Sequence, residues 1–317
     1  MVRRISIAVV TILVVLLLNF LIIHLAPGDP VRILSGMDNP SEEVMEALRV
    51  KYGLDKPLSV QMFNYFAALL RGDLGFSISY NLPVAKLISE KVGPTLLLTF
   101  SSAVIGLILG ASSALFSSRR RVVWIDTVLS FLSYVFYSMP SFWLGLILIL
   151  VFAVNLHVFP TSGIVSLREP QIGIMYYLDV LWHSFLPVTC LALINFPIYY
   201  RITHSSISSV LHENFIGLFR ATGMDERKIF GKYISRNAIL PTITIFGLQI
   251  GYAVTGATLV ETVFAWPGMG RLLINAVFRR DYPLLMGIYL IMSVSVAIAM
   301  IVVDVLYAVL DPRIRYT

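Results

Sequence analysis

Six long apolar segments constrain the fold of this chain more than any other feature of its sequence. They cover residues 5–25, 94–116, 126–156, 181–203, 240–263 and 284–310. A helix needs about 20 residues to cross the hydrocarbon core of a bilayer, so each segment is long enough. With 57% hydrophobic and only 13% charged residues, the chain carries more apolar surface than a soluble domain can bury. The sequence therefore predicts an all-α integral membrane protein with six transmembrane helices.

Clusters of Lys and Arg beside these segments predict the orientation. They lie at Arg3 and Arg4, at 119–121, within 201–236, and at Arg313 and Arg315. Positive charge is enriched in cytoplasmic loops, so both termini are predicted to be cytoplasmic. The net charge of +6 follows the ends of the apolar segments, a distribution that argues against a nucleic-acid partner.

Residues 27–93 form the largest polar insertion and are close to neutral, which fits the external side. Ser41 is a suitable N-cap and Gly53 a suitable stop for a helix over 41–52. Amphipathic patterns predict two further helices, over 60–70 and 84–91. We expect a small external helical subdomain, which could either dock a substrate-binding protein or serve as a scaffold over the membrane helices.

Two apolar segments carry small residues at four-residue spacing, and polar or helix-breaking residues occur within the later segments. Ser102, Gly106, Gly110 and Ala114 form one small-residue face, and Gly247, Gly251 and Thr255 form another. This pattern lets helices approach closely in lipid. Pro140 predicts a kink in the third segment. Candidate residues for a transport path are Tyr137, Met139, Pro140, Asn195, Gln249 and Glu261. The alternatives are aromatic packing around Pro140, a hydrogen bond to another helix for Asn195, and solvation of Glu261 or its pairing with Arg271.

The stretch 205–236 is a polar interruption between two apolar segments, yet it has the pattern of ordered structure. Phe215, Leu218 and Phe219 recur at helical spacing, and Gly223 can end that short helix in a positive-φ conformation. Asp225 is a suitable N-cap for a second helix. An apolar stripe facing outward here would suit docking into a groove of a soluble partner.

Motifs for catalysis and metal binding are not found in the sequence. It contains no phosphate-binding G-x-x-x-x-G-K-[ST], no G-x-S-x-G, no H-E-x-x-H and no cysteine pair. The five histidines have no ligand spacing, and Cys190 is the single cysteine. No catalytic residue, metal site or cofactor is therefore assigned to this chain, and energised transport would need a separate ATPase subunit.

Several motifs run through the whole chain in the order of one known family. Ala221, Gly223 and the run Ile239-Leu240-Pro241 match the EAA loop of ABC-importer permeases. The runs at 24–30, 264–271, 279–283 and 311–315 are similar to the dipeptide/oligopeptide/nickel branch. The chain thus resembles a permease subunit of this branch. It departs from the fuller EAA pattern at Leu218 and Phe219, where small residues are frequent.

The resemblance implies a type I ABC-importer permease fold, with residues 1–317 as one transmembrane domain and 205–236 as a cytoplasmic coupling loop. It implies a second homologous permease, two ATP-binding subunits that bind ATP and Mg²⁺, an external substrate-binding protein, and location in the cytoplasmic (inner) membrane. Peptide is the expected substrate, with nickel, glutathione or oligosaccharides as alternatives. A secondary transporter or channel, or an intramembrane enzyme, would be the alternatives from other classes. The residues expected to contact the ATPase are Glu213, Asn214, Phe215, Leu218, Phe219, Arg220, Ala221, Gly223 and Met224.

Overall fold

The computed structural model describes residues 2–25, 40–120, 122–166 and 171–310. Residues 26–30 of the first motif, residues 27–39 of the predicted external insertion, and the motif at 311–315 lie outside these ranges. The described chain is almost entirely helical, with one two-stranded hairpin.

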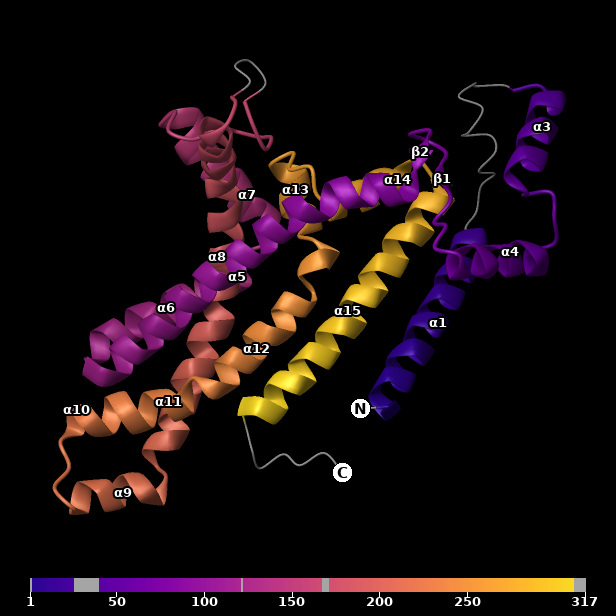
Figure 1. Ribbon diagram of the computed structural model, residues 1–317. Helices are drawn as coiled ribbons and strands as arrows, with labels where there is room; N and C mark the ends of the chain where they lie inside the picture. The colour runs from indigo at the N-terminus through magenta and orange to yellow at the C-terminus, as the bar shows by residue number, and fades with distance from the viewer. Residues whose placement is uncertain (1, 26–39, 121, 167–170, 311–317) are drawn as a thin grey trace.

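The elements follow one another along the chain as a series of long helices with short ones between them (Figure 1). η1 and η2 are π-helical and η3 is a 3₁₀ turn. In order they are α1 (Val2–Leu25), α3 (Glu42–Tyr52), α4 (Leu58–Leu70), β1 (Phe76–Ser77), β2 (Leu82–Pro83), α5 (Val84–Arg120), α6 (Val123–Ser138), α7 (Ser141–Leu148), η1 (Ile149–Asn155), α8 (Ile174–Leu211), α9 (Asn214–Ala221), α10 (Glu226–Lys228), η2 (Ile229–Ile234), α11 (Ser235–Ala238), α12 (Leu240–Gly251), η3 (Ala253–Thr255), α13 (Thr258–Val263), α14 (Met269–Phe278) and α15 (Tyr282–Leu310).

Four helical stretches among the described residues are long and apolar enough to cross a membrane. They are 84–119, α8, the run 226–255 and residues 282–302 of α15. The helices on either side of Pro140 make a fifth if they count as one span, although they are bent by 106°. α1 is a helix of 24 residues, of which 10–21 form a shorter apolar stretch. The total of six spans therefore stays a prediction.

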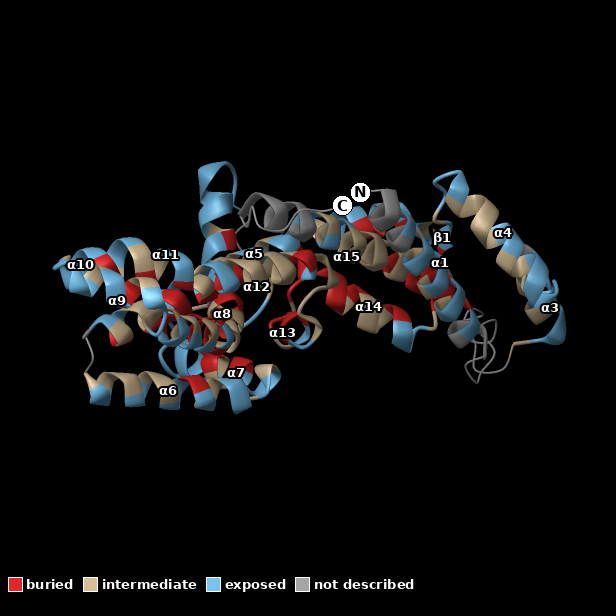
Figure 2. Ribbon diagram, turned by 90° about the horizontal axis from the view of Figure 1, so that it is seen from below, coloured by how far each residue is buried: buried red, intermediate tan, exposed pale blue. Residues whose placement is uncertain are grey.

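The bundle has two ends (Figure 1). α9, α10 and α11 lie at one of them, together with the start of α1 and the last turns of α15. α3, the hairpin, α13 and α14 lie at the other. We call these the α9 end and the α14 end. Figure 2 shows buried residues gathered around α13 and α14 and along α8. By contrast, α4 has no buried residue and α6 has only Ser133.

The helices predicted within residues 27–93 are partly confirmed and partly wrong. Ser41 caps α3 by accepting a hydrogen bond from Val44 N–H, and Gly53 ends it with φ of 67°. The pattern over 84–91 does form a helix, but that helix continues through Pro94 into α5 and is not a separate external element. Pro94 does not break α5, in keeping with the tolerance of membrane helices for proline. The hairpin pairing Phe76 with Pro83 was not predicted.

The small-residue face of α5 is confirmed as a packing surface against α8. A Cβ added at Gly106 would lie 2.9 Å from Asn195 Cβ, and one at Gly110 would lie 2.7 Å from Tyr199 Cβ. Only glycine allows the two backbones to come this close. The similar face predicted for 247–255 holds at Gly251, where an added Cβ would lie 2.2 Å from Ala299 Cβ.

The segment 240–263 is not one helix, contrary to the prediction. α12 ends at Gly251, a single 3₁₀ turn follows, and Gly256 has φ of 81° before α13 begins. Gly256 also lies against the backbone of another segment, since a Cβ there would be 2.9 Å from Gly270 N. The break therefore serves a close contact between α13 and the start of α14.

Candidate functional site

The 205–236 loop is mostly helical, and its first part belongs to α8. The predicted end of that helix near residue 203 is wrong, because α8 continues without a break to Leu211. Residues 204–211 contain no Gly or Pro to stop it. Ile207, within this extension, is fully buried in the cluster that joins α8 to η2 and α11.

α9 is the predicted short helix, but its aromatic residues do not all face outward. Phe219 packs on Tyr233 with ring centroids 4.4 Å apart, and Phe215 lies edge-on to Phe219 at 5.9 Å. Ile216 is fully buried between them and the rest of the cluster. The expected outward apolar stripe is therefore wrong at Phe215 and Phe219, which attach α9 to the following helix. Leu218 is the large apolar residue that stays outside, at 62% exposed.

Gly223 forms the predicted corner, and the backbone there is a Schellman motif. Gly223 N–H donates to the carbonyl of Arg220 at 3.0 Å, and Met224 N–H donates to that of Phe219 at 3.1 Å. The motif needs a left-handed residue after the helix, and Gly223 has φ of 75°. A Cβ at this position would meet nothing within 4 Å. The requirement for glycine is thus conformational and not steric.

The second helix begins directly after Asp225, as predicted. Lys228 N–H donates to the Asp225 carbonyl at 2.9 Å, but within the described chain the Asp225 side chain makes no capping hydrogen bond. Its neighbour Glu226 instead binds Arg220 across the corner, with Nε 2.6 Å from Oε1. This ion pair is well exposed, so it contributes little to stability and mainly orients the two side chains.

The corner is fixed to the ends of two long helices. Ile229, Ile234 and Ala238 are fully buried and pack with Ala114 of α5 and Ile207 of α8. The helix that follows the corner is therefore packed tightly against both α5 and α8.

The outer surface of α9 is small and open. Asn214, Gly217, Leu218 and Ala221 are all exposed. A Cβ at Gly217 would meet nothing within 4 Å, so this face can approach another backbone closely. Glu213, Arg220 and Gly223 at its edges are exposed as well, whereas Met224 is half-buried under the corner.

The predicted path residues around Pro140 lie at a break where the two flanking helices are bent by 106°. Met139 adopts an extended conformation between α6 and α7 and packs against the cluster of α7, α8 and α13. Pro140 is exposed at the first position before α7. Tyr137 is 62% exposed and lines a cavity with residues of α8 and α12. Of these three residues, Tyr137 is the one that lines this cavity.

Asn195 and Gln249 lie inside the bundle. Asn195 is half-buried where α8 crosses Gly106, and its side chain makes no hydrogen bond within the described residues. The expectation of a bond to another helix is therefore not met there. Gln249 accepts a hydrogen bond from the Tyr199 hydroxyl, which links α12 to α8.

Glu261 is neither solvated nor paired with the Arg271 guanidinium, so both sequence alternatives are wrong. Its side chain is fully buried. It accepts hydrogen bonds from the Thr95 hydroxyl at 2.9 Å and from Arg271 backbone N–H at 3.0 Å. The Arg271 guanidinium points elsewhere, donating to the Ala265 carbonyl at 2.7 Å. The carboxylate thus lies at the N-terminus of α14, where the helix dipole favours negative charge.

The residues around this carboxylate form a compact set, which we call the Glu261 junction: Thr95, Glu261, Trp266, Gly268, Met269 and Arg271. Thr95 accepts from Met269 N–H at 2.7 Å, and the fully buried Trp266 donates its indole N–H to the Pro94 carbonyl at 2.9 Å. A Cβ at Gly268 would lie 2.4 Å from the carboxylate. The run 264–271 that carried the family resemblance therefore wraps around Glu261 and joins α14 to α5.

A second buried acid holds the hairpin. Asp281 is fully buried and caps α15 by accepting from Leu284 N–H at 3.2 Å. Its other oxygen accepts from the Ser77 hydroxyl at 2.5 Å and from Ser79 N–H at 2.9 Å. Arg279 lies 5.1 Å from the centre of the Tyr80 ring. The run 279–283 is thus the attachment point for the 76–83 hairpin.

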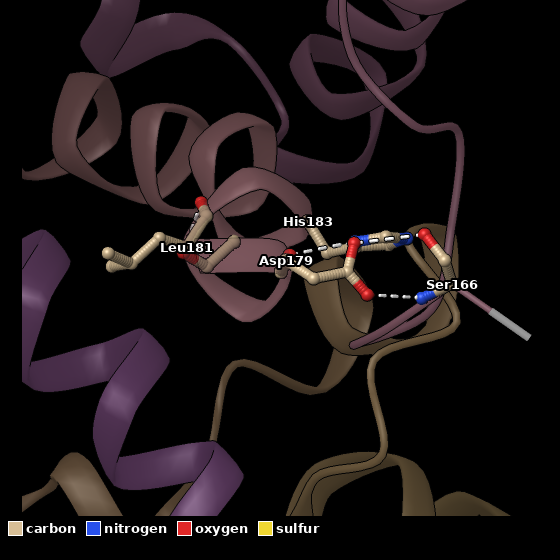
Figure 3. Close-up of polar contacts among 5 residues, drawn as sticks. Ser166, Asp179, Leu181 and His183 are labelled. Atoms are coloured by element: carbon tan, nitrogen blue, oxygen red, sulfur yellow. Dashed lines mark hydrogen bonds and ion pairs between the residues drawn. The ribbon is translucent and has the colours of Figure 1, made fainter. Parts of the chain in front are cut away.

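Sequence reasoning missed one polar cluster at the start of α8 (Figure 3). The Asp179 carboxylate accepts from Ser166 N–H at 2.6 Å and from the Ser166 hydroxyl at 2.9 Å, and lies 3.1 Å from His183 Nδ1. These contacts tie the loop before α8 to its first turns. The spacing of Asp179 and His183, four residues apart on one helix, was the available signal.

Two further groups were missed at the other end of α8. His204 Nε2 lies 3.0 Å from Asp126 Oδ1, and Tyr200 donates to the same oxygen at 3.1 Å. Arg201 lies over the rings of Tyr134 and Tyr137. In the sequence it served only as one of the positive charges that mark the cytoplasmic side. Among the described residues no group of three or more His, Cys, Asp or Glu could hold a metal ion.

Two family models together match nearly the whole chain. One is the binding-protein-dependent transport system inner membrane component, over residues 102–316, and the other is the N-terminal part of such a membrane component, over residues 1–99. The first alone covers more than half of the sequence. The chain belongs to this family. It is therefore a multi-pass inner-membrane component of a binding-protein-dependent transport system, which is the permease part of an ABC transporter.

Curated relatives match over nearly their full length. The oligopeptide transport system permease protein AppB of Bacillus subtilis is 37% identical over 317 residues, covering 99% of this chain and 98% of that protein. The dipeptide transport system permease protein DppB of Escherichia coli K12 is 34% identical over 331 residues, with the same coverage. The glutathione transport system permease protein GsiC of Salmonella choleraesuis is 37% identical over 306 residues, covering 96% and 95%.

A solved structure supports the fold. The MetNI methionine ABC transporter, crystallised in inward-facing conformations, contains a chain that aligns with a TM-score of 0.54 at 15% identity. The alignment covers 72% of this chain and 97% of that one. At this identity the match shows a shared permease fold and nothing of the substrate.

Proposed function

We propose that this chain forms half of the translocation path of an ATP-driven importer that takes up peptides. Its relatives bear names that specify oligopeptide, dipeptide and glutathione transport, and their identities to this chain are nearly equal. Two of those three names specify peptides in general and glutathione is itself a peptide derivative, which favours peptide over nickel or oligosaccharide. The complete importer would contain a second homologous permease, two ATP-binding subunits that bind ATP and Mg²⁺, and an external substrate-binding protein.

The proposed topology has six spans, with both termini in the cytoplasm. The start of α1 and the last turns of α15 lie at the α9 end, the end that carries the basic 205–236 loop (Figure 1). Positive loops mark the cytoplasmic side, so the α14 end would face outward. The hairpin, α3 and α4 would then be external, where a substrate-binding protein can reach them.

The observation that carries the proposal is the open face of α9 beside a corner that is fixed to two spans. Asn214, Gly217, Leu218 and Ala221 offer a small surface with one projecting leucine, which suits a groove on a soluble partner. ATP-driven closure of the ATP-binding subunits would displace α9. Because Ile229 and Ile234 are buried against α5 and α8, the displacement would move these helices together and switch the access of the cavity.

Isolation of the intact complex is the first test. The chain is extracted from its native membrane in mild detergent and its partners and ATPase activity are measured. The proposal expects a second permease, ATP-binding subunits, and activity that an external binding protein stimulates. The ligand of that binding protein would then identify the substrate. Recovery of the chain alone without ATPase activity, or uptake driven by a proton gradient, would favour a secondary transporter or channel.

A matched pair of leucine substitutions tests the docking face. Leu218 on α9 is 62% exposed, and Leu70 at the end of α4 is 91% exposed. Placing a charge in a tightly packed apolar contact typically costs several kcal/mol. Leu218→Arg should therefore lose the ATP-binding subunits on purification, and Leu70→Arg, at the opposite end of the bundle, should retain them. Equal retention by both variants would contradict docking through α9.

A further inference from the structure

A cavity of about 730 Å³ lies between α6, α8 and α12. Tyr137 lines it from α6, Arg201, Ser205 and Ser209 line it from α8, and Pro241 lines it from the start of α12. The volume is in the range of sites that hold small ligands. Its lining combines one cation, several hydroxyl groups and apolar side chains, a composition suited to a solute with an anionic group.

Arg201 is positioned in this cavity by two aromatic rings. Its guanidinium carbon lies 5.6 Å from the ring centres of both Tyr134 and Tyr137, within the range of cation–π attraction. The two tyrosines are three residues apart on α6 and therefore share a face. Within the described part of the chain no carboxylate lies at ion-pair distance from Arg201. Its charge is thus held in place without being neutralised.

Hydroxyl groups extend the polar surface along α8. Arg201, Ser205 and Ser209 are spaced four residues apart, which places them on one side of the helix. The hydroxyls of Ser205 and Ser206 form no hydrogen bond with any described residue, whereas Ser209 donates to the Ser205 carbonyl at 3.2 Å. A guanidinium with hydroxyl donors one turn away is the arrangement that binds a carboxylate with charge-assisted hydrogen bonds.

Long basic side chains near the end of a span can also reach the lipid headgroups. The position of Arg201 argues against that role as its main one. Its guanidinium rests on tyrosines that belong to a different helix, and it lines a cavity together with polar residues. A residue that only anchors the helix in lipid needs no such cavity.

We propose that Arg201, with the hydroxyls of Ser205 and Ser206, binds the free carboxylate of a peptide on its way to the cytoplasm. The inference rests on the proposed function, because the α9 end must face the cytoplasm and the solute must be a peptide. Every unmodified linear peptide carries a terminal carboxylate whatever its side chains, so one arginine can serve substrates of many sequences. Contacts with Arg201 and the two hydroxyls would offset part of the cost of removing that carboxylate from water.

Photolabelling of the assembled complex tests the site. Benzoylphenylalanine replaces Ile198, an apolar residue lining the cavity, in the complete importer in nanodiscs with ATP and its binding protein. The probes are radiolabelled trialanine and trialanine amide. Labelling by trialanine should exceed labelling by the amide by about tenfold, and Arg201→Gln should remove this difference. Arg201→Lys should keep part of it, because lysine preserves the charge but not the fork of donors.

The control removes a charge of the same sign elsewhere. Arg119 lies at the end of α5 and lines a different cavity, so Arg119→Gln should leave the preference for the acid unchanged. ATPase stimulation by the binding protein checks that each variant is folded and assembled. An unchanged preference in Arg201→Gln, or no labelling from position 198 during active uptake, would overturn the inference and leave Arg201 as an anchor at the lipid headgroups.

Failure of the proposed function would be seen separately. A wild-type complex that hydrolyses ATP but takes up no trialanine contradicts the proposal that the protein imports peptides. The proposed carboxylate site is then contradicted as well. A wild-type complex that takes up trialanine, combined with an indifferent Arg201→Gln variant, contradicts only the site.

Discussion

The Thr95 hydroxyl donates a hydrogen bond to the Glu261 carboxylate at 2.9 Å, although the two residues are 166 positions apart. Thr95 lies in α5, just after Pro94, and Glu261 lies in α13. The bond thus joins the second and fifth predicted spans at the α14 end. Both residues are fully buried, so its partners have no water to replace a lost bond.

Glu261→Gln should destabilise the protein by about 1–3 kcal/mol, because the amide turns an N–H₂ group toward one of two buried donors. The measurement is the thermal melting of the purified complex in detergent. Glu90→Gln makes the same chemical change at an exposed position and should melt as the wild type does. Equal melting of the two variants would show that the buried carboxylate contributes nothing to the junction.

Gly110→Ala should weaken the contact between α5 and α8. The new methyl group would lie 2.7 Å from Tyr199 Cβ and 2.8 Å from the Phe196 carbonyl, and such overpacking costs about 1–3 kcal/mol. Gly93→Ala is the matched control in the same helix, because a Cβ there meets nothing within 4 Å. It should be neutral or stabilise the helix by up to about 1 kcal/mol. The melting temperature should therefore fall in Gly110→Ala and stay unchanged or rise in Gly93→Ala.

Gly223→Val should abolish transport while membrane insertion stays intact. Holding a β-branched residue at positive φ costs about 1–3 kcal/mol, so the corner after α9 would rearrange. Gly231→Val is the control, because both glycines face open space but only Gly223 has a positive φ. Peptide uptake is compared at equal amounts of protein in the membrane. Normal uptake by a well-expressed Gly223→Val complex would refute a coupling role for this corner.

Asp281→Asn should loosen the hairpin. The new amide nitrogen would face either the Ser77 hydroxyl and Ser79 N–H or the Leu284 N–H. In both cases a buried donor would lose its acceptor. Chymotrypsin should then cut after Phe76 or Tyr80 several times faster than in the wild type. Asp55→Asn, at an exposed position, should leave the cleavage rate unchanged, and a similar rate in both variants would contradict the attachment.

The sequence predicted those features that depend on neighbouring residues. Ser41 and Gly53 mark the ends of α3 because capping involves residues within one turn. Gly106 and Gly110 indicated close packing because their spacing alone places them on one face. Gly223 indicated a corner because few other residues take positive φ.

The features that escaped prediction depend on residues far away in the chain. The burial of Glu261 follows from a loop that folds back over it, and no local pattern distinguishes this from exposure at the end of a helix. Phe215 and Phe219 face inward because Tyr233 lies beneath them. The contact of Arg201 with two tyrosines could not be predicted, because it depends on how α6 packs against α8.

The two buried acids also have a consequence for how the chain is made. Ser77 and Asp281 are 204 residues apart, and Pro94 and Trp266 are 172 apart. Synthesis proceeds from the N-terminus, so the hairpin and the start of α5 are finished long before the residues that bind them exist. Thr95 lacks its partners until the chain has been extended past Met269, and Ser77 lacks its partner until the chain has passed Asp281. A ribosome that stalls before that point leaves a chain whose α14 end lacks these contacts.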